Sequence, residues 1–176
     1  MKVIITRAVA LFGCVVALQA TPALASEQVP FQASFHGQFQ ITFGGCANGD
    51  NLLRFAGTGI ATTAGLSSID GVSCLRPEAA NPLCSTIDDT TVTVTAANGD
   101  VFGFNNQAED CLSFTAAGVF INGAGTYQIL PGTGRFEAAS GSGSVHTTAQ
   151  VLVLTATGAS GTFDPLTFVG TISEGQ

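Results

Sequence analysis

The stretch GTGRFEAASGSG, which runs from Gly132 to Gly143, contains a glycine spacing with which backbone N–H groups can surround a phosphate. In a dinucleotide-binding loop, G-x-G-x-x-G opens a long helix. Here Gly132 and Gly134 provide the first two glycines, but Glu137 stands in place of the third, where its carboxylate would repel a pyrophosphate. A P-loop is also excluded, because the chain beyond residue 25 contains no lysine. We therefore predict no phosphate site in this stretch.

The same stretch is better explained as a turn that closes one end of the fold. Gly132 turns the chain out of a strand. Thr133 is predicted to cap a short helical turn over residues 135–139, and Gly141 to end that turn. Phe136 then lies on the face that packs against the interior, together with Ala139, three residues further on. We assign a structural role in this turn to Gly132, Gly134, Phe136 and Gly141.

Four cysteines follow residue 25, namely Cys46, Cys74, Cys84 and Cys111. An even number in an exported chain predicts two disulfides, with three connectivities open. One of them joins Cys74 to Cys84 across a proline-containing loop and Cys46 to Cys111 across two distant segments. No C-x-x-C spacing occurs, and the histidines are not clustered with the thiols, so we predict no metal site and no cofactor.

The residues that could act as acids, bases or nucleophiles form no recognisable catalytic set. His36 and His146 are the only histidines, and both lie in Gln- or Thr-rich strand faces that we expect to point into solvent. The acidic pairs Asp88-Asp89 and Glu109-Asp110 could do acid–base work, but adjacent strand residues point to opposite faces. We predict that these pairs hold loops in water, and we assign no catalytic residue.

Arg54 is the charged residue with the most apolar neighbours, because Leu53 and Phe55 flank it. If its guanidinium pointed into the interior it would need an acidic partner or a ligand, since an unpaired buried charge is costly. Arg54 is therefore our one weak candidate for ligand binding.

The N-terminus predicts export. Two basic residues precede an apolar run from Ala8 to Leu18, and Ala23 to Ala25 form an A-x-A cleavage site, so residues 1–25 are interpreted as a signal peptide. The run is too short to span a membrane, and we expect no membrane span after cleavage. A lipid anchor at Cys14 is a weaker alternative. Residues 26–176 form one domain, which we place in the periplasm or outside the cell.

The charge of the exported part argues against several partners. Two of the five basic residues leave with the signal, so three arginines face twelve acidic residues. Such a surface repels phosphate backbones and has no basic patch that could release counterions. Nucleic acid and anionic lipid are therefore excluded as partners.

Strands position all of these residues. From Phe31 to Phe43 the chain alternates, with Phe35, Phe39, Ile41 and Phe43 on one face and polar residues such as His36 on the other. Similar strands are predicted at residues 52–62, 66–74, 90–96, 100–105, 119–130, 144–157 and 162–173. Val151–Leu154 is apolar on both faces, so we expect a cover over it or a subunit contact.

Two details of the connections are predicted. The tetrapeptide ANGD occurs at residues 47–50 and 97–100, and Asn-Gly favours a hairpin with a type I′ turn. Residues 104–117 contain no glycine and no proline. We interpret this segment as a loop followed by a strand, with a short helix as the alternative. About eight antiparallel strands with short turns fit a closed barrel and a sandwich equally well.

A resemblance favours the barrel. PGTGRFEAASGSG, residues 131–143, resembles the GGTGxFxxAxG signature of the allene oxide cyclase and dirigent barrels, and residues 95–173 are similar to small secreted bacterial proteins of that superfamily. The resemblance implies an eight-stranded antiparallel barrel, an interior that can hold a small apolar ligand, and a homotrimer. The acidic residues that family enzymes use have no counterpart that we can match, so no catalytic residue is carried over.

Three functions follow from these expectations. A non-enzymatic binding protein would have an unfilled cavity lined by phenylalanines with few polar groups. A barrel enzyme of isomerase or cyclase type would bury a carboxylate or Arg54 in that cavity with a perturbed pKa. A structural or envelope protein would have an interior filled by side chains such as Phe35, Phe39 and Ile41. We favour the binding and structural functions over catalysis.

Overall fold

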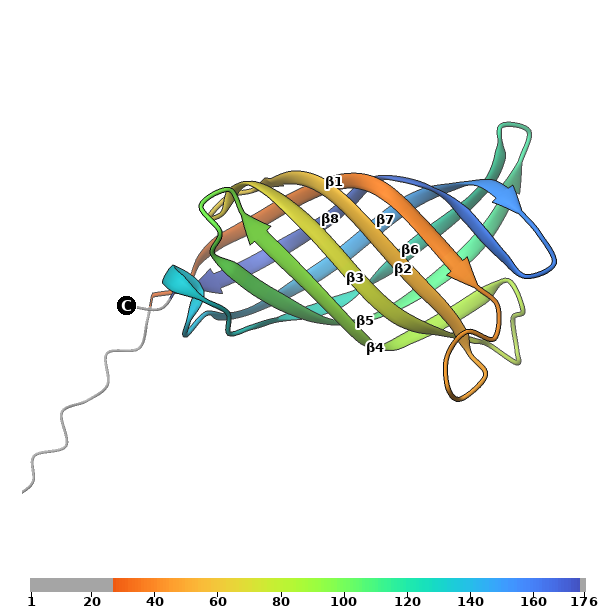
Figure 1. The fold of residues 1–176 in the computed structure, drawn as a ribbon, viewed down its shortest axis with the longest axis horizontal. Coiled ribbons are helices and arrows are strands. Elements are labelled where there is room, and N and C mark those ends of the chain that lie inside the picture. The colour runs from red at the N-terminus through yellow and green to blue at the C-terminus, as the bar shows by residue number, and fades with distance from the viewer. Residues whose placement is uncertain (1–26, 175–176) are drawn as a thin grey trace, which may run out of the picture.

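The computed structural model describes residues 27–174 and shows a single closed barrel. Eight antiparallel strands follow one another around the barrel in chain order, and β8 pairs back to β1 (Figure 1). The predicted barrel is thus confirmed, and the sandwich alternative is wrong. The predicted signal peptide lies outside the described residues. The strands are β1 (Val29–Thr42), β2 (Asn51–Ala61), β3 (Gly65–Pro77), β4 (Cys84–Ala96), β5 (Val101–Thr115), β6 (Gly118–Leu130), β7 (Ser140–Leu154) and β8 (Gly158–Ser173).

Alternation along the strands separates an apolar interior from a polar outer surface. In β1, the phenylalanines at 31, 35 and 39 are buried, whereas the even-numbered residues, such as Gln38 and Gln40, are exposed. Successive strand residues point to opposite sides, so one register places every second side chain inside the barrel. The interior is therefore a space for apolar side chains or an apolar ligand.

Strand β5 differs from the sequence-based expectation. Residues 104–117 were predicted to form a loop followed by a strand. Instead, β5 runs without interruption from Val101 to Thr115 and pairs with β6 from Gly103 to Thr115. The amide and acidic residues between Phe104 and Leu112 made the segment resemble a loop. Pairing on both sides by β4 and β6 supplies the backbone hydrogen bonds that the local sequence does not indicate.

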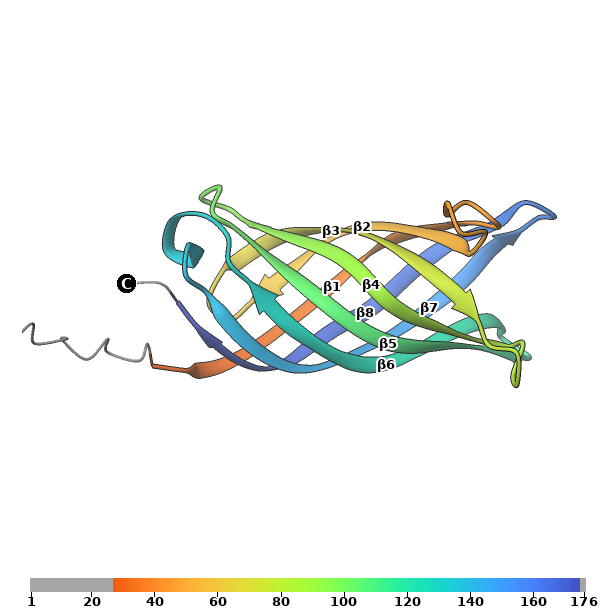
Figure 2. The ribbon, with the colours of Figure 1, turned by 90° about the horizontal axis from the view of Figure 1, so that it is seen from below.

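The two ends of the barrel differ. At one end β1 begins, β8 ends, and a short 3-10 helix, η1 (Gly134–Phe136), connects β6 to β7 (Figure 2). We call this the closed end. The opposite end, called the open end, carries the β1–β2, β3–β4, β5–β6 and β7–β8 connections (Figure 1).

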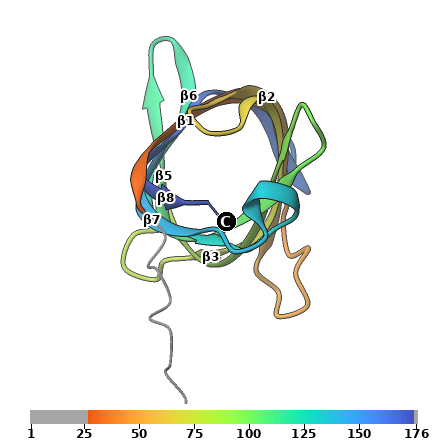
Figure 3. The same ribbon diagram turned by 90° about the vertical axis from the view of Figure 1, so that its left-hand side faces the viewer.

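Aromatic rings fill the closed end, and η1 lies at one side of this end in the view along the barrel (Figure 3). Phe136 and Ala139 are fully buried, and the Phe136 ring centroid lies 4.6 Å from that of Phe102. The predicted packing of these two residues against the interior is therefore confirmed, and we call the segment that carries them, residues 132–139, the lid. The aromatic cluster consists of Phe31, Phe35, Phe102, Phe104, Tyr127, Phe136 and Phe168.

Details of the predicted turn were wrong. Thr133 makes no capping hydrogen bond; instead its Oγ1 accepts one from the Val101 N–H at 3.0 Å, which ties the lid to β5. The helical part ends at Phe136, and Gly141 lies inside β7 and ends no helix. Gly134 has the left-handed φ of +58° that favours glycine, and Gly132 occupies the turn after β6, as expected.

Both ANGD tetrapeptides form turns with the same hydrogen bonds. In the second copy, the Asp100 N–H donates to Asn98 Oδ1 at 3.1 Å, and the first copy repeats this bond between Asp50 and Asn48. The second copy joins β4 to β5 as predicted, but type I′ is wrong, because positive φ occurs only at the glycines among the described residues. A side-chain bond from Asn to the following backbone makes positive φ at Asn unnecessary.

Two disulfides stabilise the connections of the open end. Cys46 pairs with Cys74, and Cys84 pairs with Cys111. The two disulfides expected from the even cysteine count are therefore present, but the connectivity Cys74–Cys84 with Cys46–Cys111 is wrong. Cys84 and Cys111 are opposite each other in the register of β4 and β5, which places the pair within reach of a direct bond. Disulfides fit an oxidising compartment.

Within residues 27–174, no helix has the length and apolar character needed to cross a membrane.

Candidate functional site

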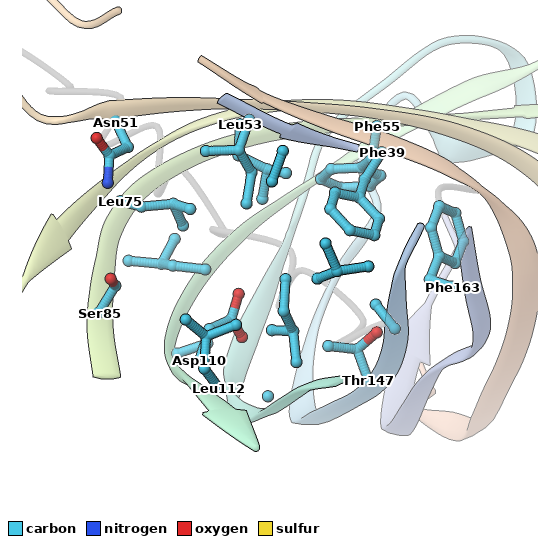
Figure 4. A pocket seen from close by; sticks show the side chains of 18 of the residues that line it. Phe39, Asn51, Leu53, Phe55, Leu75, Ser85, Asp110, Leu112, Thr147 and Phe163 are labelled. Carbon is cyan, nitrogen blue, oxygen red and sulfur yellow. The ribbon is translucent and has the colours of Figure 1, made fainter. Parts of the chain in front are cut away.

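A cavity of about 310 Å³ occupies the barrel between the aromatic cluster and the open end (Figure 4). Each of the eight strands contributes apolar side chains to its wall, for example Phe55 of β2, Leu112 of β5 and Phe163 of β8. The floor includes Phe168, whose ring stacks on Phe104 with 4.4 Å between centroids. This volume is at the lower end of the range for small-molecule sites.

The rim of the cavity is also apolar. Phe43, Leu83, Phe114 and Leu154 line the cavity where it opens, and each is between 42% and 64% exposed. They come from four different strands or connections of the open end. An apolar molecule that enters here therefore meets no ring of charged side chains at the entrance.

Among residues 27–174, Asp110 is the only charged residue that lines the cavity. It lies on β5 with its side chain directed inward, and its carboxylate points into the cavity in Figure 4. Among the described residues, the carboxylate has no ion pair and no hydrogen bond. An unpaired carboxylate in an apolar surrounding is costly, so this one is a candidate for contact with a ligand.

Gly123 makes room for this carboxylate. The two residues are directly opposite each other in the register of β5 and β6. A Cβ at position 123 would collide with Asp110 Oδ1 and would lie 2.7 Å from Thr147 Cγ2. A larger residue would occupy the space into which Asp110 and Thr147 project and would force these side chains to move.

Ser85 and Thr147 continue a polar row at the level of Asp110. Ser85 is opposite Asp110 in the register of β4 and β5, and Thr147 is opposite Gly123 in the register of β6 and β7. Both line the cavity. We call Ser85, Asp110, Gly123 and Thr147 the polar row. Further toward the closed end, buried Asn106 Oδ1 also lacks a hydrogen-bond partner.

Burial raises the pKa of the Asp110 carboxyl from 3.8 to about 6. Desolvation is the cause, because removal from water disfavours the charged form of an acid. No other side chain that lines the cavity titrates in this range. At neutral pH, Asp110 therefore carries most of a negative charge inside an apolar cavity.

Arg54, the weak ligand-binding candidate, is not in the cavity. Its side chain is exposed on the outer surface of β2, opposite Gln40 of β1 and Val72 of β3. The alternation places Leu53 and Phe55 inside and the residue between them outside, so the hypothesis of an inward guanidinium is wrong. His36 and His146 are exposed, as predicted.

Asp110 was missed because its neighbours suggested a loop. Glu109 and Asp110 do point to opposite faces, with Glu109 exposed, but they lie in the middle of a strand and not in a solvated loop. The signal that could have identified Asp110 was the alternation of apolar residues at 102, 104, 108, 112 and 114, which continues through it. The even-numbered residues of this segment face inward, so an acid at residue 110 belongs to the inner face.

The cavity distinguishes among the three functions considered above. An unfilled space lined by phenylalanines with few polar groups is what the binding function predicts, and a buried carboxylate is what the enzyme function predicts. The structural function predicts a filled interior. Phe35 does lie in the packed aromatic cluster, but Phe39 and Ile41 line the cavity.

Comparison of the chain with protein-family models, with curated proteins and with solved structures finds no match.

Proposed function

We propose that this protein is a non-enzymatic binding protein that holds one small apolar molecule inside its barrel. The observation that carries the proposal is the cavity of about 310 Å³, lined by apolar side chains from every strand and closed at one end by the aromatic cluster. Transfer of an apolar molecule from water to such a lining is favourable by about 25 cal/mol per Å² of buried apolar surface. The exported location predicted from the sequence makes the ligand a molecule that the protein meets outside the cytoplasm.

The rigidity of the barrel supports binding to a preformed site. All strand edges are paired, and the two disulfides hold the connections next to the open end. Little conformational entropy is then lost when a ligand enters, which is the condition for useful affinity in a small site. The resemblance to ligand-holding barrels points to the same function.

Titration with decan-1-ol, followed by calorimetry, tests this proposal. Decan-1-ol has an uncharged apolar chain, and we expect one molecule to bind per barrel. The variant Ala149→Trp should abolish binding, because Ala149 is buried and lines the cavity, so an indole there occupies the ligand space. Its matched control is Thr148→Trp, which places the same side chain on the exposed outer face. Equal binding by both variants would contradict the proposal.

A second experiment identifies the natural ligand. Native mass spectrometry of protein purified from its own exporting host should show a barrel that carries one small molecule, and Ala149→Trp protein should carry none. The same spectra give the number of subunits and confirm the two disulfides by mass.

Asp110 favours an isomerase- or cyclase-type enzyme as the second candidate. A carboxyl with a pKa near 6 can exchange a proton near neutral pH. Extraction of the bound molecule from wild-type and Asp110→Asn protein distinguishes the two functions. A binding protein yields the same compound from both, whereas an enzyme yields isomers that separate by chromatography.

A further inference from the structure

At neutral pH, the Asp110 carboxylate makes the cavity less favourable for a purely apolar molecule than for an apolar molecule that also carries a positive charge. A ligand that fills the cavity displaces the water that can reach the carboxylate, and the charge then has no partner among the described residues. An unpaired charge in an apolar site is far less stable than the same charge in water. A ligand that carries its own positive charge removes this cost.

We propose that the ligand is a lipophilic amine, whose apolar chain fills the cavity and whose ammonium group pairs with Asp110 in the polar row. This inference rests on the proposed binding function and specifies its ligand class. The hydroxyl oxygens of Ser85 and Thr147 are placed by register on either side of Asp110 and Gly123. An ammonium group has three N–H donors, so one carboxylate and two hydroxyl acceptors match its hydrogen-bonding capacity.

The rest of the chain favours a cation over an anion. No basic side chain of the described residues lines the cavity, so a carboxylic acid would face Asp110 with like charge. Arg76 and Arg135 are engaged on the outside with acidic residues, Arg76 with Asp88 at 2.8 Å and Arg135 with Asp100 at 3.7 Å. Twelve acidic residues against five basic ones give the whole chain a negative field that attracts cations.

The polar row also distinguishes an amine from a ketone. A ketone oxygen could accept a hydrogen bond from the Ser85 or Thr147 hydroxyl, but a ketone has no donor or positive charge for the Asp110 carboxylate and would leave it unpaired. The elements packed against Asp110 add no competing charge inside: β4 presents Ser85, β6 presents Gly123, and β7 presents Thr147. Glu109, next to Asp110 on β5, and His146 of β7 are exposed on the outer face, and Tyr127, with its pKa raised to about 12 by burial, stays neutral. Amine binding is therefore expected to follow the ionisation of Asp110 alone.

Calorimetric titration of the disulfide-intact protein with decylamine, decan-1-ol and decanoic acid at pH 7.5 tests the inference. We expect wild-type protein to bind decylamine at least tenfold more tightly than decan-1-ol and to bind decanoic acid more weakly than either. In Asp110→Asn, decylamine affinity should fall at least tenfold, while decan-1-ol affinity should not fall and should rise if the unpaired charge opposes its binding. The matched control is Glu109→Gln, which removes the neighbouring charge from the outer face and should leave decylamine affinity unchanged.

The pH dependence gives a second readout that a structural role of Asp110 would not produce. Between pH 7.5 and pH 5, wild-type affinity for decylamine should fall about tenfold, because the amine stays charged while a carboxyl with a pKa near 6 becomes protonated. Asp110→Asn should show no such change. A ketone probe, undecan-2-one, that binds more tightly at pH 5 than decylamine at pH 7.5 would overturn the inference in favour of a neutral Asp110 donor.

The outcomes separate this inference from the proposed function. If decan-1-ol binds and Asp110→Asn binds decylamine as tightly as wild-type protein does, the amine inference is wrong and the binding function stands. If none of the three probes binds wild-type protein while it remains folded by circular dichroism, both fail.

Discussion

At the scale of single residues, Asp110 links the stability of the fold to its cavity. The folded-state pKa of about 6 lies above the ordinary value of 3.8, so folding takes up a proton between these two values. Stability from this group is therefore full below pH 4 and is lost as the pH rises through 6. The shift corresponds to at most about 3 kcal/mol. The free protein gives up stability at neutral pH to keep a carboxylate in the cavity.

The variant Asp110→Asn tests this relation. It keeps the shape of the side chain without its charge, so we expect it to raise the free energy of unfolding at pH 7.5 by up to about 3 kcal/mol and to leave it nearly unchanged at pH 4. Urea unfolding at the two pH values, with the disulfides intact, measures the difference. A gain of the same size at both pH values would show that the charge of Asp110 is not the cause.

The residue scale is also where the sequence was least informative. The cysteines, the exposed histidines and the buried Phe136 could be predicted from residue type and alternation. The partners of the cysteines could not, because connectivity depends on which strands are neighbours. Asp110 was missed because its segment was interpreted as a solvated loop, and the inward orientation considered for Arg54 is excluded by the alternation of β2, which places Leu53 and Phe55 inside.

At the scale of elements, η1 is the part that makes one end of the barrel different from the other. Its three residues carry Phe136 into the aromatic cluster, and Arg135 lies over the same ring, with its guanidinium carbon 4.9 Å from the ring centroid. η1 contributes few other contacts, so it stabilises the closed end mainly through the buried Phe136 ring.

We therefore expect Phe136→Ala to lower the free energy of unfolding by about 3–5 kcal/mol, the usual cost of removing a buried phenylalanine ring. Thr133→Ala, which removes only the hydrogen bond to the Val101 N–H, should cost about 1 kcal/mol. Urea unfolding of both variants provides the comparison. A loss of less than 1 kcal/mol for Phe136→Ala would mean that the lid is not part of the cooperative core.

The strands show how far local patterns predict elements. β1 could be predicted because its alternation is uninterrupted from Phe31 to Ile41. β5 could not, because amide and acidic residues at positions 105–110 lower the strand propensity of its middle part, and pairing with its neighbours β4 and β6 holds it extended. Asp110 lies on this strand, which is why the apolar cavity wall could be predicted and its charged group could not.

At the scale of the whole molecule, the exposed end of β7 provides a test of assembly. Leu152 and Val153 are 62% and 53% exposed, as expected of a segment that another surface could cover. The homotrimer implied by the sequence resemblance remains a prediction. If this segment forms the subunit contact, Leu152→Ser with Val153→Ser will convert the assembly to monomers in native mass spectrometry, while Ile60→Ser, at an equally exposed position of β2, will not. A monomeric wild-type protein would contradict the trimer outright.

The even number of strands has a practical consequence for anything joined to this barrel. Because β1 begins and β8 ends at the same end, and that end is the one sealed by η1, a tether attached through either strand holds the molecule with its opening facing away. A sensor chip, a fluorescent fusion or a neighbouring domain coupled in this way leaves the route to the cavity free.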